Sequence, residues 1–202
     1  MYNAFLNFKK NLEESKALAV LYNYLDEAVK GPVSYEDLLR AQVVYSVSAF
    51  DKLLHDLILI GLVDIYTGRR QPTDKYLGEA LTINTVNKMT AATLPPAEFH
   101  FKEAMLSKLR IVSYQDPGKI SDGLAYIWKE SHKWVKVANE MNMSDRDVKA
   151  QLRLIADRRN SIVHEADVHP VTHTKNSIDA AISNEVTGFL ERCGEAIYYL
   201  VK

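Results

Sequence analysis

The spacing of apolar residues along the chain predicts helices over most of its length. Apolar residues recur every three to four positions over residues 2–29, and a Gly-Pro pair ends that run. A second run continues to about Tyr66, and Ser34 followed by Asp37 gives its start the spacing of a capping box. Apolar residues cover most of the circumference of this second helix, so we expect it at the centre of a bundle, where its polar residues need partners.

The remainder of the chain predicts short helices and then longer ones. Residues 67–96 mix turn residues with short apolar pieces, so we expect short helices and loops there. Helical periodicity then returns over residues 97–112, 118–139 and 144–166. Ser144 has the spacing of a cap for the last of these segments, and we expect Ser177 to cap a final helix.

Together these elements predict an all-α fold. We expect an antiparallel helical bundle of about five main helices plus short helices, in a single domain over residues 1–202. The composition agrees, because 47% hydrophobic and 25% charged residues is the range of ordinary globular proteins. Four polar residues interrupt the most apolar stretch, residues 43–65, so it is expected to be a buried core helix and not a membrane span.

Charge and cysteine content narrow the functional classes. The formal net charge of -1 gives no overall attraction to phosphate, so any nucleic-acid contact must come from a local cluster of Lys and Arg. Cys193 is the one cysteine, which excludes an intramolecular disulfide, and the first residues show no signal-peptide pattern. We therefore expect a cytoplasmic protein.

The densest cluster of charge is "DRRNSIVHEAD", residues 157–167. On a helix turning by roughly 100° per residue, Arg159 lies in the middle of an apolar face. That face is formed by Leu152, Ile155, Ala156, Ile162, Val163 and Ala166. One flank of the helix gathers Arg153, Asp157, Asn160 and His164. Arg158 falls on the other side, so the two neighbouring arginines are not equivalent.

Two interpretations of this cluster remain open on spacing alone. A guanidinium on an apolar face must pair with a buried acid or line a cleft or interface, and Asp51 and Asp56 on the central helix are candidate partners. A buried Arg–Asp pair with a surface histidine would account for the same residues. Alternatively, Arg159 contacts a phosphate and His164 transfers a proton, which suits phosphodiester chemistry.

The segment from Arg159 to His164 resembles the R-X4-6-H motif of HEPN domains, an all-helical superfamily of nucleotide-binding proteins and ribonucleases. Arg158 also meets the allowed spacing, but the asparagine that follows Arg159 and its place on the apolar face favour Arg159. The stretch "YSVSAFDKLLHDLI", residues 45–58, is similar to the apolar early helix, carrying an acid, of RiboL-PSP-HEPN proteins. The resemblance covers most of the chain.

This resemblance implies a metal-independent endoribonuclease that acts as a homodimer with a composite active site and needs no cofactor. His164 would transfer the proton, Arg159 would neutralise the phosphate, and Asn160 would orient the scissile group or the imidazole. Asp51 would orient Arg159, and Arg158 would have a supporting role. RNA is the substrate that this chemistry requires, because DNA lacks the 2′-hydroxyl nucleophile.

The resemblance also implies a toxin–antitoxin or antiphage defence setting, with an antitoxin protein as a further partner. A non-catalytic HEPN-like module that binds a nucleotide or a protein is the alternative, and a purely structural helical module is a third reading. Cleavage of RNA without added metal would discriminate between these functions.

Two other patterns receive a simpler interpretation. His164, His169 and His173 could be drawn as a zinc site, but no cysteine is near and His164 already has a role, so we expect no metal. Arg69 and Arg70 could contact phosphate, but such a pair is more typical of a solvated turn.

Overall fold

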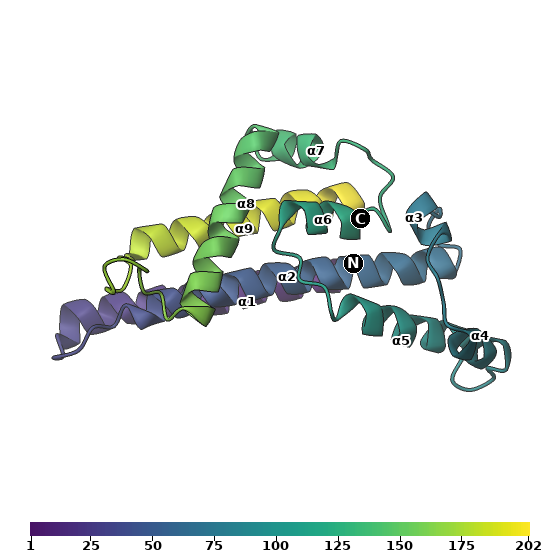
Figure 1. Ribbon diagram of the computed structural model, residues 1–202, viewed down its shortest axis with the longest axis horizontal. Helices are drawn as coiled ribbons and strands as arrows, with labels where there is room; N and C mark the ends of the chain where they lie inside the picture. Colours follow the sequence, from purple (N-terminus) through teal and green to yellow (C-terminus); the bar gives the residue numbers. More distant parts are fainter.

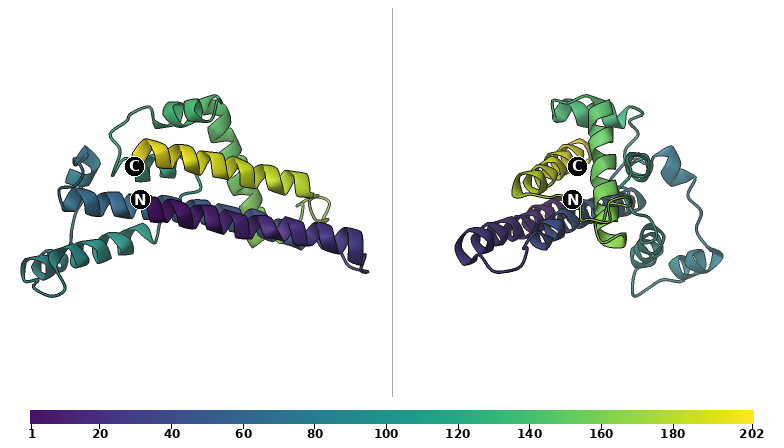
Figure 2. Two further views of the ribbon diagram at one scale, coloured as in Figure 1. Left: turned by 180° about the vertical axis from the view of Figure 1, so that it is seen from behind. Right: turned by 60° about the vertical axis from the view of Figure 1, so that its left-hand side comes forward.

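The computed structural model describes all residues, 1–202, and consists of helices and connecting loops (Figure 1). Three long helices lie side by side, and a fourth crosses them steeply (Figures 1 and 2). The three are α1 (Tyr2–Tyr24), α2 (Asp37–Tyr66) and α9 (Ala180–Val201), and the crossing helix is α8 (Asp145–His164). A π-helical turn, Leu25–Val29, extends α1.

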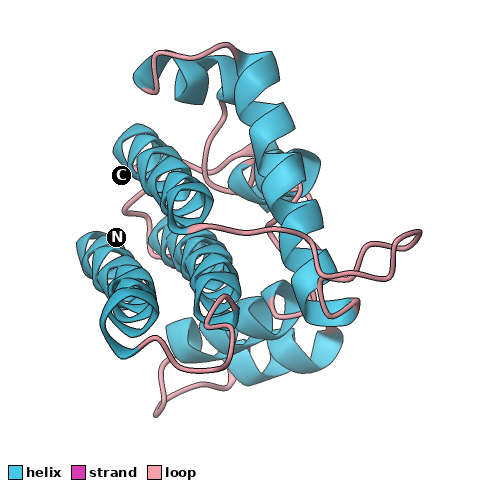
Figure 3. Ribbon diagram, turned by 90° about the vertical axis from the view of Figure 1, so that its left-hand side faces the viewer, coloured by secondary structure: helices cyan, strands magenta, loops and turns pink.

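Five shorter helices complete the fold. They are α3 (Asp74–Leu77), α4 (Ile83–Thr90), α5 (Ala97–Leu109), α6 (Pro117–Leu124) and α7 (Lys133–Glu140). No β-strand is present, and a single antiparallel bridge, Val168 to Lys175, lies in the loop that projects between α8 and α9 (Figure 3). The predicted all-α class is confirmed.

Helix α2 lies at the centre of the apolar core, as its apolar circumference predicts. The core is one cluster of 39 buried residues that extends from Phe5 to Val201. Leu54, Leu57 and Ile58 on α2 are completely buried. Burying a side chain of this size typically contributes about 1.5–3 kcal/mol, so α2 is the main source of packing energy in the fold.

The polar residues of α2 find their partners in a buried seam between the three long helices. Ser15 of α1 donates a hydrogen bond of 2.9 Å to the backbone oxygen of Gln42. The Gln42 side chain donates to Thr187 of α9 at 3.1 Å and accepts from Ser183 at 2.7 Å, and the Ser46 and Thr187 hydroxyls are 2.9 Å apart. Because each buried polar group is satisfied, the seam fixes the register of the helices without leaving an unpaired donor.

Two predicted helix caps are wrong. Glu36 precedes α2 as its N-cap, and the Ser34 hydroxyl accepts a hydrogen bond from Glu36 N instead of forming a box with Asp37. Asp179, and not Ser177, caps α9, because its carboxylate accepts from a backbone N–H of the first turn at 2.7 Å. Both errors are of two residues, the range in which several polar side chains compete to cap one helix.

The helix predicted over residues 118–139 is divided into α6 and α7. Residues 125–132 turn between them, which places Ile127 against α2 at Gly61. A Cβ atom at Gly61 would lie 2.5 Å from a methyl carbon of Ile127, so the contact requires glycine. Burial of Ile127 thus overrides the helical periodicity of the segment.

The two chain termini lie close together beside the second half of α2 (Figures 1 and 3). Arg70 joins them, because its guanidinium donates to the Met1 sulfur at 3.7 Å and to the backbone oxygen of Val201, and it also donates to the backbone oxygen of Ile127. Arg69 forms an ion pair with Asp64 at 2.9 Å. The interpretation of these arginines as a solvated turn is therefore wrong for Arg70, which links three segments of the fold.

No helix has the length and apolar character required to cross a lipid bilayer.

Candidate active-site cleft

Helix α8 carries the predicted motif, and its beginning follows the sequence prediction. The Ser144 hydroxyl accepts a hydrogen bond from Asp147 N at 3.1 Å and so caps the helix. Val148, Leu152 and Ile155 are buried and hold the first half of α8 on the core. The rotation of the helix, and hence the direction of each motif residue, is set by these three side chains.

The second half of α8 leaves the core earlier than predicted. Ile162 is only partly buried and Val163 is 43% exposed. The helix ends at His164, and Ala166 is exposed in a left-handed backbone conformation, so the predicted apolar face does not reach Ala166. Arg159 consequently lies where the core-facing side of the helix emerges from the core, and its side chain is half-buried.

A buried arginine–aspartate cluster is present, but its arginine on α8 is Arg158 and not Arg159. The Asp167 carboxylate is completely buried and accepts hydrogen bonds from Arg158 at 2.9 Å and from Arg40 of α2 at 2.7 Å. Arg158 also donates to the backbone oxygen of Ser177 at 3.0 Å. Burial lowers the pKa of Arg40, but the hydrogen bonds with its acids more than offset this and raise it, so the cluster is ionic.

The cluster stabilises an unusual turn after α8. Ala166 and Asp167 both have positive φ angles, 52° and 57°, which L residues rarely adopt. Asn176 donates to a carboxylate oxygen of Asp167 at 3.1 Å and so closes the loop on itself. Such backbone conformations cost about 1–3 kcal/mol each, a cost that the hydrogen bonds to Asp167 offset.

Arg159 lines an open cleft of about 460 Å³ between α8 and the segment of residues 113–119. Its guanidinium donates a hydrogen bond of 3.1 Å to the Asn160 side chain and forms no ion pair. From the predicted flank of α8, Arg153, Asp157 and Asn160 line the same cleft. Arg159 is therefore free to bind an anion that enters the cleft.

The facing wall of the cleft comes from a part of the chain that the sequence prediction did not consider. Ser113, Gln115, Asp116 and Lys119 line it. Asp116 caps α6 by accepting from Gly118 N and Lys119 N at 2.7 and 3.2 Å, and Trp134 donates to the backbone oxygen of Pro117 at 3.0 Å. The one available signal was the "DPG" cap, which predicts where α6 begins but not that it faces α8.

Asp51 contacts this facing wall and not Arg159. Its carboxylate accepts a hydrogen bond of 2.5 Å from Tyr114 N, and its second oxygen lies 3.5 Å from the His55 ring. Burial raises the pKa of the Tyr114 phenol to about 12, so this side chain remains neutral beside Asp51. The other candidate partner of Arg159, Asp56, pairs with Lys52. Asp51 therefore holds the cleft wall in place from α2.

His164 lies outside the cleft. Its side chain is exposed at the end of α8 and does not line the cleft with Arg159. His164 follows Asn160 by four residues, so it lies on the same side of α8 but about 6 Å, roughly one turn, beyond the last residue that lines the cleft. A reaction that uses both residues needs a second molecule of the protein or a movement at the end of α8.

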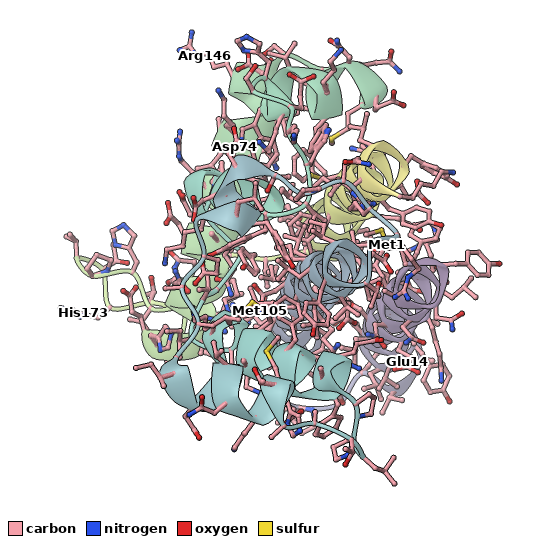
Figure 4. All side chains as sticks on the ribbon, turned by 90° about the vertical axis from the view of Figure 1, so that its right-hand side faces the viewer. Met1, Glu14, Asp74, Met105, Arg146 and His173 are labelled. Atoms are coloured by element: carbon pink, nitrogen blue, oxygen red, sulfur yellow. The ribbon has the colours of Figure 1, made fainter.

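The two histidines that follow α8 in the chain, His169 and His173, do not line the cleft. The His169 ring accepts hydrogen bonds from Val171 N and Thr172 N, both at 3.2 Å. His173 is exposed at the outer end of the loop that follows α8 (Figure 4). No group of three or more histidine, cysteine or acidic side chains has an arrangement that could hold a metal ion.

The sequence matches the family model RiboL-PSP-HEPN over residues 9–201, which include α2, the cleft and the segment from Arg159 to His164. The chain belongs to the RiboL-PSP-HEPN family. The predicted membership of the HEPN superfamily is thereby confirmed. A search of curated proteins and a search of solved structures each gave no match.

Proposed function

We propose that this RiboL-PSP-HEPN protein is a metal-independent endoribonuclease. The observation that carries the proposal is the different surroundings of the two adjacent arginines. Arg158 is bound to the buried Asp167, whereas Arg159 lines a polar cleft beside Asn160 without an acidic partner. A guanidinium in such a position is suited to neutralise a phosphate, because its planar donor group remains protonated.

In the proposed reaction the ribose 2′-oxygen attacks the adjacent phosphorus. A bond from the 2′-oxygen to phosphorus forms, the bond from phosphorus to the 5′-oxygen breaks, and the products are a 2′,3′-cyclic phosphate and a 5′-hydroxyl. Arg159 stabilises the charge on the pentacoordinate phosphorane, and Asn160 orients the scissile phosphate. The nucleophile belongs to the substrate, so no metal-activated water is needed.

His164 carries the proton transfers in this scheme, and a homodimer supplies them. A neutral imidazole from one protomer accepts the 2′-hydroxyl proton, and an imidazolium from the other protonates the leaving 5′-oxygen. The exposed position of His164, one turn beyond the residues that line its own cleft, supports this arrangement. Val163, in the same helical turn, is an exposed apolar side chain that a second protomer would cover.

The decisive experiment is RNA cleavage in excess EDTA with analysis of the product ends. Wild-type protein should yield 2′,3′-cyclic phosphate and 5′-hydroxyl ends, and a substrate with 2′-O-methyl at the cut site should survive. His164→Ala should lose activity by a factor of about 10² or more, since proton transfer typically contributes about 10² to 10⁴ in rate. Cleavage that stops in EDTA, or products with 5′-phosphate ends, would indicate that a water molecule and not the 2′-oxygen attacks the phosphorus. Either result would refute the role of His164.

A non-catalytic module that binds a nucleotide or a protein is the second candidate. The separation of His164 from the cleft favours it, because a binding site does not need the histidine. Tight binding of RNA or nucleotide with no cleavage at high protein concentration would establish this alternative.

We place the activity in the cytoplasm, in a toxin–antitoxin or antiphage defence setting with an antitoxin protein as partner. Growth of cells that express the wild type or His164→Ala tests this setting. Arrest by the wild type alone supports a toxin, whereas equal growth of both strains counts against it.

A further inference from the structure

Three cationic side chains line the cleft, and none of them forms an ion pair. They are Lys119 on one wall and Arg153 and Arg159 on the other. Outside the cleft, Arg40 and Arg69 are paired with acids, whereas Arg110, Arg146 and Arg192 form no ion pair either. Because a group of neighbouring cations repels itself, its presence without partners indicates a site for an anion.

The two acids of the cleft offset only part of this positive charge. Asp116 directs one carboxylate oxygen to the backbone N–H groups at the start of α6, where it serves as a helix cap. Asp157 lines the cleft on the same flank of α8 as Arg153, but it forms no ion pair with Arg153 or Arg159. The three cations are therefore available to a ligand.

The chemistry of the walls suits a phosphate backbone and not nucleic-acid bases. Ala156 is the one hydrophobic residue among the nine that line the cleft, and no aromatic side chain is among them. Bases of single-stranded nucleic acids are held chiefly by stacking on aromatic rings, which this cleft lacks. Its hydroxyl, amide and cationic groups are instead those that contact phosphate and ribose.

The spacing of the cations fits more than one phosphate. Arg153 and Arg159 are six residues apart, a rise of about 9 Å along α8. Lys119 reaches the same space from the opposite wall. A ligand that contacts all three must extend along α8, as successive phosphates of a single strand do and a lone phosphate does not.

We propose that Arg153 and Lys119 bind backbone phosphates of the RNA next to the phosphate held by Arg159, so that the strand runs along α8 toward its beginning. This inference rests on the proposed function in taking RNA as the ligand. The cleft then binds the backbone of the RNA and not its bases. Any preference for particular bases must therefore come from another surface of the protein.

The test measures binding of a labelled 2′-O-methyl RNA of about 12 nucleotides, which cannot be cleaved, to wild type and variants. Arg153→Gln and Lys119→Gln should each weaken binding about tenfold, the value of a hydrogen bond to a charged group at a partly exposed site. Each should also reduce the slope of log Kd against log salt by about 0.7, the value for one phosphate contact to a single strand.

Matched controls are available for both substitutions. Arg192→Gln removes the same charge from an exposed position on α9 outside the cleft, and Lys129→Gln removes a lysine charge from an exposed position outside the cleft. Both should retain wild-type affinity within about twofold, because charges beyond a Debye length are screened. Losses in the controls equal to those in the cleft variants would show a nonspecific charge effect and overturn the proposal.

Base identity provides a second readout. The ratio of the dissociation constants for oligo-A and oligo-U should be the same in wild type and in the Arg153→Gln/Lys119→Gln double variant, because the cleft contacts the backbone. A ratio that changes in the double variant would assign base recognition to the cleft. Displacement of the RNA by adenosine monophosphate at concentrations near the Kd of the RNA would assign a mononucleotide site, and either result overturns the proposal.

Failure of this inference is distinguishable from failure of the proposed nuclease. Where wild type cleaves RNA, the double variant should raise KM with little change in kcat, since the lost contacts are equal in ground and transition states. Unchanged KM and unchanged binding would refute the inference and leave the nuclease standing. Absence of cleavage with the predicted losses in binding would refute the nuclease and leave backbone recognition standing.

Discussion

Arg158 and Arg159 are adjacent in the chain, but their guanidinium groups lie in different environments on α8. Arg158 donates a hydrogen bond of 2.9 Å to the buried Asp167, and Arg159 donates to Asn160 in the open cleft. One residue of separation rotates the side chain by roughly 100°, which is enough to move it from the loop contact to the cleft. The pair therefore allows stability and activity to be separated by substitutions at neighbouring positions.

We expect Arg159→Ala to lower RNA cleavage about 10²-fold or more while changing the free energy of unfolding by less than about 0.5 kcal/mol. Arg158→Ala should lower the free energy of unfolding by about 1–3 kcal/mol, because it removes a charged hydrogen bond to a buried carboxylate. Urea unfolding and an RNA cleavage assay on the same preparations measure both effects. The reverse pattern, with Arg159→Ala the less stable variant, would contradict the assignment of the two arginines.

Asp51 should act through the backbone of Tyr114 and not through its charge. Asp51→Asn keeps an oxygen that can accept from Tyr114 N, so it should retain most of the cleavage activity. Asp51→Ala removes that acceptor, and we expect a loss of about 1–3 kcal/mol in stability together with reduced cleavage, because the facing wall is no longer held. Equal losses of activity in Asp51→Asn and Asp51→Ala, without a change in stability, would instead indicate the orienting charge that the sequence suggested.

The apolar pattern alone predicts the all-α fold and the central place of α2, because a helix that is apolar on all sides must be surrounded by others. It also places Arg159 and Arg158 on different sides of α8, since the rotation per residue is fixed by the helix. These predictions depend only on local geometry. That is why they agree with the structure.

The partner of the buried arginine could not be derived in the same way. Asp167 belongs to the cluster first singled out, but it reaches Arg158 only because Ala166 and Asp167 adopt left-handed conformations. Aspartate adopts the left-handed region more often than most residues do, but alanine favours the helix, so the residue types do not predict two left-handed residues in succession. Lys119 was missed for a related reason: it enters the cleft through the packing of α6 against α8, a tertiary contact without a local signal.

The proposed dimer predicts a dependence of activity on the exposed end of α8. Val163→Glu should convert the dimer to a monomer and abolish cleavage, because it places a charge at an apolar contact beside His164. Leu94→Glu is the control, since Leu94 is 91% exposed in the loop before α5 and should tolerate the same change. Light scattering gives the oligomeric state, and a dimeric, active Val163→Glu would place the dimer interface elsewhere.

The contact between α1 and α9 predicts a specific dependence of stability on pH. Glu191 is mostly buried and accepts hydrogen bonds from Lys9 and from Lys16, the latter at 2.9 Å. Burial raises the pKa of Glu191, but the two lysines more than offset this and hold it below its ordinary value near 4.5. A lowered pKa in the folded state means that Glu191 stabilises the fold at pH values above 4.5 and loses this effect as the pH falls toward the lowered value.

Glu191→Gln should therefore be less stable than wild type by about 1 kcal/mol at neutral pH, the upper range for partly exposed ion pairs. The difference should shrink as the pH falls below about 4.5, because the wild-type carboxylate then becomes protonated as well. Glu14→Gln is the matched control on α1, since Glu14 is exposed and lies 3.8 Å from Lys10, and it should change stability little at any pH. Urea unfolding of the three proteins between neutral pH and acid measures these differences. A Glu191→Gln deficit that stays constant, or grows, as the pH falls would mean that the glutamine is penalised for packing and not for the loss of the carboxylate's charge.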